Sequence, residues 1–125
     1  MASFSWEHLT QYHCQYLDIV LSRKKEIACQ YEIDKHNGTC SANLEKIKEF
    51  LKTNSFLIWT NSYPYDVELN VRHYVFWFSQ NYTMEDAVEI AKVHFKTDNI
   101  VIMCNIQSLK SVLDIEHYHL FVLDV

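Results

Sequence analysis

RHYVFWFSQNYTMEDAVEIAKVHFKTDNIVIMC, residues 72–104, contains the clearest structural pattern of the chain. Residues 72–78 are dense in aromatic and β-branched side chains, which favours a strand. Thr83, followed three residues later by Asp86, forms a capping-box pattern, and the apolar residues after it recur at helical spacing. Residues 100–104 are an apolar run, which predicts another strand. The stretch therefore predicts a strand, a helix and a strand in succession.

The flanking sequence adds two strands to this unit. Upstream, residues 56–59 are a short apolar run that suits a buried strand, and residues 116–122 form a final strand downstream. The second half of the chain is therefore expected to run β-β-α-β-β. Its hairpin-like neighbours favour a mostly antiparallel, four-stranded sheet covered by helices. The predicted fold class is α+β.

The first part of the chain is expected to supply the N-terminal helices that pack on this sheet. Ser5 suits an N-cap, a second helix is expected over residues 26–35, and a third is expected after Ser41. The length of 125 residues fits a single domain, 1–125, mainly helical over 1–53 and sheet plus helix over 54–125. The first helix would carry one apolar stripe, formed by Trp6, Leu9, His13, Tyr16, Leu17 and Val20. The third would bury Leu44, Ile47, Phe50 and Leu51.

The charge balance argues against nucleic acid as a partner. Sixteen acidic groups outnumber 11 basic ones, for a net charge of −5, and no basic stripe is available to neutralise phosphates. The one basic run, Arg23-Lys24-Lys25, is interpreted as a solvated helix terminus. No apolar run approaches the ~20 residues of a membrane span. Neither nucleic acid nor a membrane is therefore an expected partner.

The cysteines indicate the cellular compartment. The four of them show neither a Cys-x-x-Cys pattern nor the spacing of a zinc site. Residues 1–10 lack the basic and apolar segments of a secretory signal. Both observations predict reduced thiols and a cytoplasmic location. The richness in Ile, Asn, Lys and Tyr is typical of AT-rich genomes such as those of large DNA viruses, in which case the compartment would be the host cytoplasm.

Three histidines of the second half are the candidate catalytic residues. Because strand side chains alternate, His117 and His119 point to one face of the final strand. His73 belongs to the strand over residues 72–78. If these two strands are neighbours with matching faces, the three imidazoles form a cluster. Such a cluster could act as general acid and base near neutral pH, or contact a ligand.

Two alternatives for the same histidines stay open. Three neutral imidazoles at His73, His117 and His119 could hold a divalent metal with an open position, as catalytic zinc sites do. Alternatively, the histidines are structural, and they form hydrogen bonds to the backbone or to tyrosine hydroxyls in an aromatic core. The preferred interpretation includes neither a metal nor another cofactor.

Two loops supply candidate ligand-binding residues. Tyr63 and Tyr65 lie between two predicted strands, where binding groups concentrate. Ser108, Lys110 and Ser111 come just before the final strand. Two hydroxyls and an ammonium group suit an anionic group such as phosphate or carboxylate.

Four ordered segments of residues 56–123 resemble the fungal N-acetylglucosamine-induced protein family, a domain of unknown function that also occurs in giant viruses. The resemblance implies the family's fold, a pocket around the three histidines, and a shortened, viral member. It implies a link to amino sugars only through the family's name. Where the family has an acidic residue, this chain has Ser62; if that acid serves catalysis, the chain has kept binding alone. The segments are Asn61-x-Tyr63-Pro64-Tyr65, Val71-x-His73-Tyr74-Val75-Phe76-Trp77, Asn105-x-x-Ser108-Leu109-Lys110-Ser111-Val112 and Ile115-Glu116-His117-Tyr118-His119-Leu120.

Two functions of different classes are therefore expected. The preferred hypothesis is a pocket lined by histidine and tyrosine that binds a small polar or anionic ligand, with its enzymatic character undetermined by the sequence. The alternative is a non-enzymatic protein-interaction module, viral in origin, whose histidines are structural and whose partner is another protein.

Overall fold

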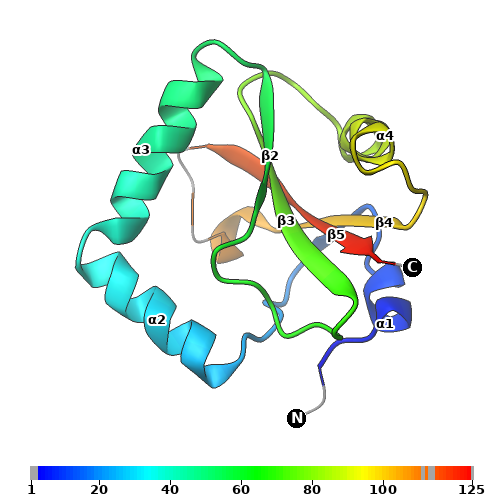
Figure 1. Cartoon of the computed structure of the whole chain (residues 1–125), viewed down its shortest axis with the longest axis horizontal. Helices are drawn as coiled ribbons and strands as arrows, with labels where there is room; N and C mark the ends of the chain where they lie inside the picture. Colours follow the sequence, from blue (N-terminus) through cyan, green and yellow to red (C-terminus); the bar gives the residue numbers. More distant parts are fainter. Residues whose placement is uncertain (1–2, 111, 113–114, 125) are drawn as a thin grey trace.

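The computed structural model describes residues 3–110, 112 and 115–124 (Figure 1). Both helices and strands occur within these residues, and the predicted α+β class is confirmed. The helices are α1 (Trp6–Thr10), α2 (Lys25–His36), α3 (Thr39–Leu51), α4 (Met84–Phe95) and the 3-10 helix η1 (Gln107–Leu109). The strands are β1 (Gln15–Leu17), β2 (Phe56–Thr60), β3 (Val71–Phe78), β4 (Ile100–Asn105) and β5 (Glu116–Leu123).

The strands of the described residues form one open sheet with the order β1-β4-β5-β3-β2. The four strands of the second half are antiparallel to their neighbours, whereas β1 pairs with β4 in parallel. The expectation of a four-stranded sheet is therefore wrong by one strand. The additional strand comes from the N-terminal part, which was expected to be helical.

The predicted N-terminal helix is shorter than its apolar stripe suggests. α1 ends at Thr10, and Cys14 takes the left-handed conformation with φ 59°. The amide of Cys14 then donates to the carbonyl of Ile102 at 2.7 Å. Pairing with β4 satisfies backbone groups that would otherwise be left unpaired at the edge of the sheet. Tyr16 and Val20, which a helix would have buried, are 63% and 52% exposed.

Local signals at the starts of α1 and α4 are confirmed. The Ser5 side chain accepts a hydrogen bond from the amide of His8, as an N-cap does. At α4, the Thr83 side chain accepts from the amide of Asp86, and the Asp86 side chain accepts from the amide of Thr83. The reciprocal pair satisfies two backbone donors that a helix start leaves without partners.

One face of the sheet is filled by α4. Ala87 and Ala91 are fully buried on the inner side of this helix, so its backbone can approach the sheet closely. The alternate residues of β3, β4 and β5 that point to this face complete a continuous core. Its buried members are Phe76, Phe78, Met84, Ala87, Val88, Ala91, Ile100, Ile102, Cys104, Tyr118, Leu120 and Val122.

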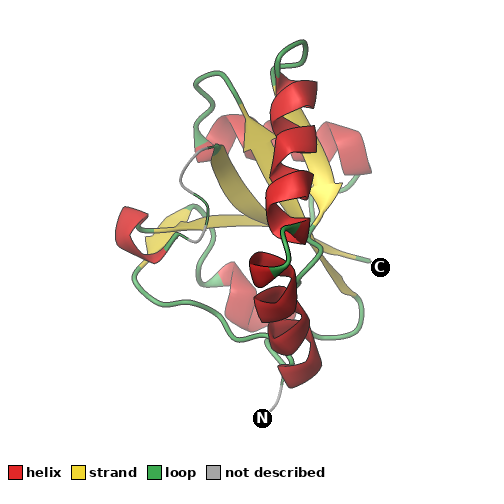
Figure 2. Cartoon of the chain, turned by 90° about the vertical axis from the view of Figure 1, so that its left-hand side faces the viewer, coloured by secondary structure: helices red, strands yellow, loops and turns green. Residues whose placement is uncertain are grey.

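The opposite face is covered in two parts. α1 and the segment after β1 pack on one part, where Leu9, Leu21 and Phe121 are buried. The pair of helices α2 and α3 lies over the other part (Figure 2). No described residue of α2 is buried, and α3 buries only Leu51.

Two predictions of burial on this second part are wrong. Leu44 and Ile47 of α3 are only half-buried, and Phe50 is exposed, because these side chains line a pocket instead of filling a core. Residues 56–59 were expected to form a buried strand, but β2 is an edge of the sheet. Trp59, near its end, is 63% exposed.

Two further features of the described residues are the character of the helices and the state of the cysteines. None of the described helices has both the length and the apolar character required to span a bilayer. All four cysteines are free thiols, as their spacing in the sequence predicted.

Candidate functional site

The sheet brings the three predicted histidines onto one face. β3 and β5 are antiparallel neighbours, with Val75 opposite His119 and Trp77 opposite His117. Residues that lie opposite each other project from the same face, and His73 shares this face by alternation along β3. Nε2 of His73 lies 2.9 Å from Nδ1 of His119, and the ring centres of His117 and His119 are 5.8 Å apart. The cluster expected from strand alternation is therefore present.

Burial keeps two of these imidazoles neutral. Loss of contact with water lowers the pKa of His119 to about 3, and the nearby positive charges of Arg23 and Lys110 act in the same direction. The pKa of His73 is held well below its usual range, first by burial and then by its neighbour His119. Each ring therefore carries one proton near neutral pH, on one nitrogen only.

One backbone amide determines which nitrogens carry these protons. The amide of Tyr65 donates to Nδ1 of His73 at 3.1 Å, so the proton of His73 must be on Nε2. This Nε2–H donates to Nδ1 of His119, whose own proton is then on Nε2 and points to the Tyr65 hydroxyl 3.3 Å away. The hydroxyl donates to Oδ1 of Asn105 at 3.5 Å, and Nδ2 of Asn105 donates to the carbonyl of Ile19 at 2.7 Å. Both nitrogens of both rings are thus used within the protein.

His117 differs from the other two histidines. Its Nδ1 donates to the carbonyl of Ile115 at 3.1 Å, so Nε2 carries a lone pair when the ring is neutral. No described residue supplies a partner for this Nε2. Burial lowers the pKa of His117, and the bond to Ile115 offsets part of that effect. His117 is therefore the histidine of the cluster that can accept a proton or a hydrogen bond from a ligand.

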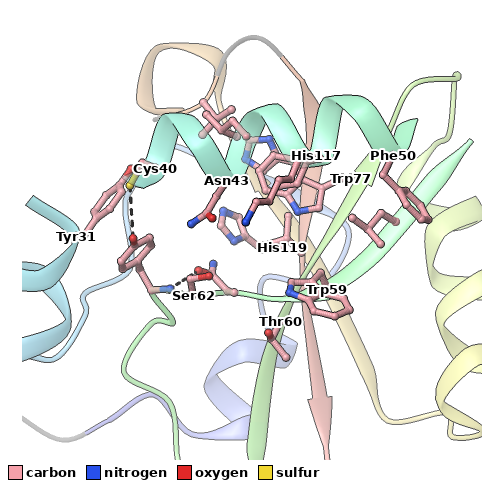
Figure 3. Close-up of a pocket in the computed structure, with 18 of the residues that line it drawn as sticks. Tyr31, Cys40, Asn43, Phe50, Trp59, Thr60, Ser62, Trp77, His117 and His119 are labelled. Atoms are coloured by element: carbon pink, nitrogen blue, oxygen red, sulfur yellow. Dashed lines mark hydrogen bonds between the residues drawn. The ribbon is translucent and has the colours of Figure 1, made fainter. Parts of the chain in front are cut away.

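A pocket of about 570 Å³ lies between α3 and this face of the sheet (Figure 3). Because β2, β3 and β5 are consecutive in the sheet, their register gives two rows of side chains across the floor of the pocket. Val75 is the small residue in the middle of one row, so the floor is hollow between its larger neighbours. Asn43 and Ile47 of α3 line the opposite wall. The rows are Leu57–Trp77–His117 and Trp59–Val75–His119.

A smaller cavity of about 70 Å³ adjoins the histidine end of the pocket. Arg23, His117 and His119 line both cavities, and Lys110 lines the smaller one. The Lys110 ammonium lies 3.7 Å from the exposed carboxylate of Glu116, which lines neither cavity. Among the described residues that line the two cavities there is no aspartate or glutamate. The charge at this end of the pocket is therefore positive.

Arg23 is held in a defined position. Its guanidinium carbon lies 4.9 Å from the ring centre of Tyr31 and 5.0 Å from that of Tyr65, and its Nε donates to the carbonyl of Tyr63 at 2.7 Å. The interpretation of residues 23–25 as a solvated helix terminus is therefore wrong for Arg23. No local pattern could have indicated this role in full, because Tyr65 is distant from Arg23 in the sequence and meets it only after folding.

The two predicted tyrosines contribute in different ways. Tyr63 lines the pocket, but its hydroxyl donates to Asp34 of α2 at 2.6 Å and so connects the loop to the helix pair. Tyr65 is buried, with its hydroxyl in the hydrogen-bonded chain of the histidines, and burial raises its pKa to about 12. Tyr65 therefore supports the site from below, whereas Tyr63 forms part of its wall.

The three residues predicted to bind an anion have different outcomes. Lys110 lines the smaller cavity, as described above. Ser108 is exposed within η1 and lines none of the pockets described, because the helical turn directs it to solvent. Ser111 lies outside the described residues.

The positions of the three histidines can be compared with those that a metal site would require. In the described part of the chain, no three side chains of the metal-ligating types converge on one point. A metal would have to replace the bond between His73 and His119, since each of these rings already uses both nitrogens. The arrangement suits a ligand contact at His117 better than a three-histidine metal site.

Comparisons with known proteins concern the fold alone. No protein-family model matches the chain, and no curated protein matches it. The crystal structure of HTC1 is similar, with a TM-score of 0.59 over 98% of this chain and 86% of that chain, at 16% sequence identity. At this identity the likeness shows a shared fold alone. The resemblance to the N-acetylglucosamine-induced protein family stays a prediction.

Proposed function

We propose that this chain is a small-ligand-binding domain whose pocket between α3 and the sheet accepts an anionic metabolite. The observation that carries the proposal is the positive end of the pocket, where Arg23 and Lys110 flank the Nε2 of His117, which has no hydrogen-bond partner among the described residues. Cations in a concave, partly desolvated site attract an anion more strongly than cations on an open surface. A phosphate or carboxylate of the ligand is therefore expected at this end.

Each residue of this end has a separate role in the proposal. The guanidinium of Arg23 is oriented by Tyr31 and Tyr65, which reduces the entropy lost when its N–H groups bind an oxyanion. Lys110 supplies a second positive charge. His117 accepts a hydrogen bond from a hydroxyl or amine of the ligand. If the domain is an enzyme, His117 is the general base, because the nitrogens of His73 and His119 are engaged elsewhere.

The protein-interaction alternative has one observation in its favour. Tyr16, Ile19 and Val20, which follow each other closely at the β1 edge of the sheet, are between 46% and 63% exposed. Exposed apolar clusters often mark interaction surfaces. His73 and His119 would be structural under either function, so they do not separate the two. The ligand test below does.

The proposal is tested by ligand-induced stabilisation. Ribose 5-phosphate at about 100 times its dissociation constant should stabilise the native state by roughly 2.7 kcal/mol, measured as a rise in Tm. Arg23→Met keeps the aliphatic length but removes the charge, and it should abolish most of the rise. Lys25→Met is the matched control, since Lys25 is an exposed cation outside the described pockets.

Two results would contradict the proposal. One is an equal rise in Tm for the wild type and Arg23→Met, which would place the anion elsewhere. The other is the lack of any rise with phosphorylated or carboxylated compounds, which would favour the protein-interaction alternative. His117→Gln, which keeps polarity but not basicity, should weaken binding without changing the Tm of the unliganded protein by more than a few degrees.

A further inference from the structure

Aromatic side chains line the pocket on the β2 side of His117. Trp59 and Trp77 project from β2 and β3, and Phe50 comes from the last turn of α3 (Figure 3). Trp77 is in contact with His117, with ring centres 4.8 Å apart. Trp59 as a residue is 63% exposed, and its indole contacts no aromatic ring of the described residues. A large aromatic face thus remains available at the mouth of a concave site.

The register of the sheet leaves room beside this indole. Trp59, Val75 and His119 lie in one row across three consecutive strands. Neighbouring strands are about 4.8 Å apart, so Trp59 and His119 are separated by roughly 9–10 Å at the backbone. Stacked aromatic rings need only about 4.5–7 Å between their centres. A planar ring can therefore lie above Val75 and stack on Trp59 while it remains connected to the histidine end.

The chemistry of the floor favours an aromatic ring over a sugar ring. Leu57 and Val75 on the floor and Ile47 on the opposite wall offer no side-chain hydrogen-bonding group, whereas Asn43, Thr60, Asn61 and Ser62 supply such groups elsewhere in the pocket lining. Sugar hydroxyls placed directly above Leu57 and Val75 would lose water without gaining a partner from these two side chains, which is unfavourable. The faces of an aromatic ring are apolar, and its polar edge can stay at the open mouth.

We infer that the ligand combines a planar aromatic ring, stacked on Trp59 above Val75, with one anionic group at Arg23 and Lys110. A nucleoside monophosphate and an aromatic carboxylate both have this chemistry. The inference rests on the proposed function, since it adds the aromatic part to an anion that the function already requires. It distinguishes such ligands from simple sugar phosphates.

The test compares three compounds by isothermal titration calorimetry. Adenosine 5′-monophosphate has a ring and a phosphate, indole-3-acetate a ring and a carboxylate, and ribose 5-phosphate a phosphate without an aromatic ring. One or both aromatic compounds should bind about tenfold or more tightly than ribose 5-phosphate, the effect expected of one stacked base. Preference for the nucleotide identifies phosphate as the anion, and preference for indole-3-acetate identifies carboxylate; either supports the inference.

Variants assign the preference to the indole. Trp59→Ala should remove the advantage of the aromatic compounds and leave the affinity for ribose 5-phosphate unchanged, while Trp59→Phe should keep most of it. Tyr16→Ala is the matched control, because Tyr16 is also on an edge strand and also 63% exposed. Both sites are exposed, so all three variants are expected to fold, as checked by circular dichroism.

The failures of the two proposals are distinguishable. Equal affinities of the wild type for adenosine 5′-monophosphate, indole-3-acetate and ribose 5-phosphate would overturn the aromatic inference and leave the anion site standing. An aromatic preference that persists in Trp59→Ala would also overturn it. Binding of none of the three compounds would overturn both proposals together.

Discussion

α4 and α3 are helices of 12 and 13 residues that lie on opposite faces of the same sheet (Figure 1). α4 presents Ala87 and Ala91 to the sheet, and both are fully buried. α3 presents larger side chains such as Leu44 and Ile47, which are half-buried, and a pocket of about 570 Å³ remains beneath it. Small residues allow a helix backbone to approach and fill the space, whereas large residues that do not interdigitate leave it open.

The contacts that hold α4 on the sheet also differ from those that hold the α2–α3 pair. α4 is held by a continuous apolar core. α2 and α3 are held at separate points, among them the Tyr63 hydrogen bond to Asp34 and the contact between the rings of Tyr31 and Tyr63, 4.7 Å apart. Stability therefore depends mainly on one face of the sheet, and the capacity to bind depends on the other. The difference leads to three measurements.

The largest expected effect compares core substitutions on the two faces. Phe76→Ala should lower the free energy of unfolding by about 3–5 kcal/mol, because Phe76 is fully buried beneath α4. Ile47→Ala should cost less than about 1 kcal/mol, since its side chain already borders an open pocket. Urea denaturation measures both values. Similar losses for the two variants would show that the α3 face is packed like the α4 face, and the comparison would fail.

The next effect is a pH dependence to which the two fully buried histidines of the pocket face contribute most. The pKa values of His73 and His119 in the folded protein lie below the value of about 6.5 in an unfolded chain, so the unfolded state binds more protons in acid. The contribution of these neutral rings to the free energy of unfolding should be fully present above pH ~6.5, and it should be lost as the pH falls from there toward about 3. When the pH falls from 7.5 to 5.5, the two rings together should lower the free energy of unfolding by roughly 2–3 kcal/mol.

The same pH experiment has a control on the other face. The buried cluster beneath α4 contains no histidine, so Val88→Ala should lower stability equally at both pH values. At pH 5, the nitrogen chemical shifts of the imidazoles should show that His73 and His119 are still neutral. A flat stability profile, or protonation of either ring at that pH, would contradict the hydrogen-bonded pair.

The smallest effect concerns the attachment of α2. Tyr63→Phe removes the hydroxyl that donates to Asp34, and the amides of α2 should then exchange with deuterium about two- to tenfold faster, while those of α4 do not change. Tyr82→Phe is the control, because its hydroxyl donates to Ser55 on the α4 side at 2.9 Å. Unchanged exchange in α2 after Tyr63→Phe would show that another contact holds the helix pair.

Local patterns were sufficient for much of the fold. The strand over residues 72–78, the capping box at Thr83 and Asp86, and the shared face of His117 and His119 all depend on residues a few positions apart. Hydrogen bonds of a helix start and the alternation of a strand act over such distances, so the sequence by itself determined them.

Tertiary contacts decided the remaining features. β1 replaced the end of a predicted helix because the edge of β4 offered hydrogen bonds to a segment distant in the sequence. Arg23 became part of the site because tyrosines of α2 and of the loop before β3 enclose it. The amide of Tyr65 fixes the hydrogen bonds of His73 and His119, so these rings have no nitrogen left for a ligand. The carbonyl of Ile115 binds only Nδ1 of His117, so its Nε2 stays available. Such outcomes depend on which distant groups meet after folding, and no local preference of the chain encodes them.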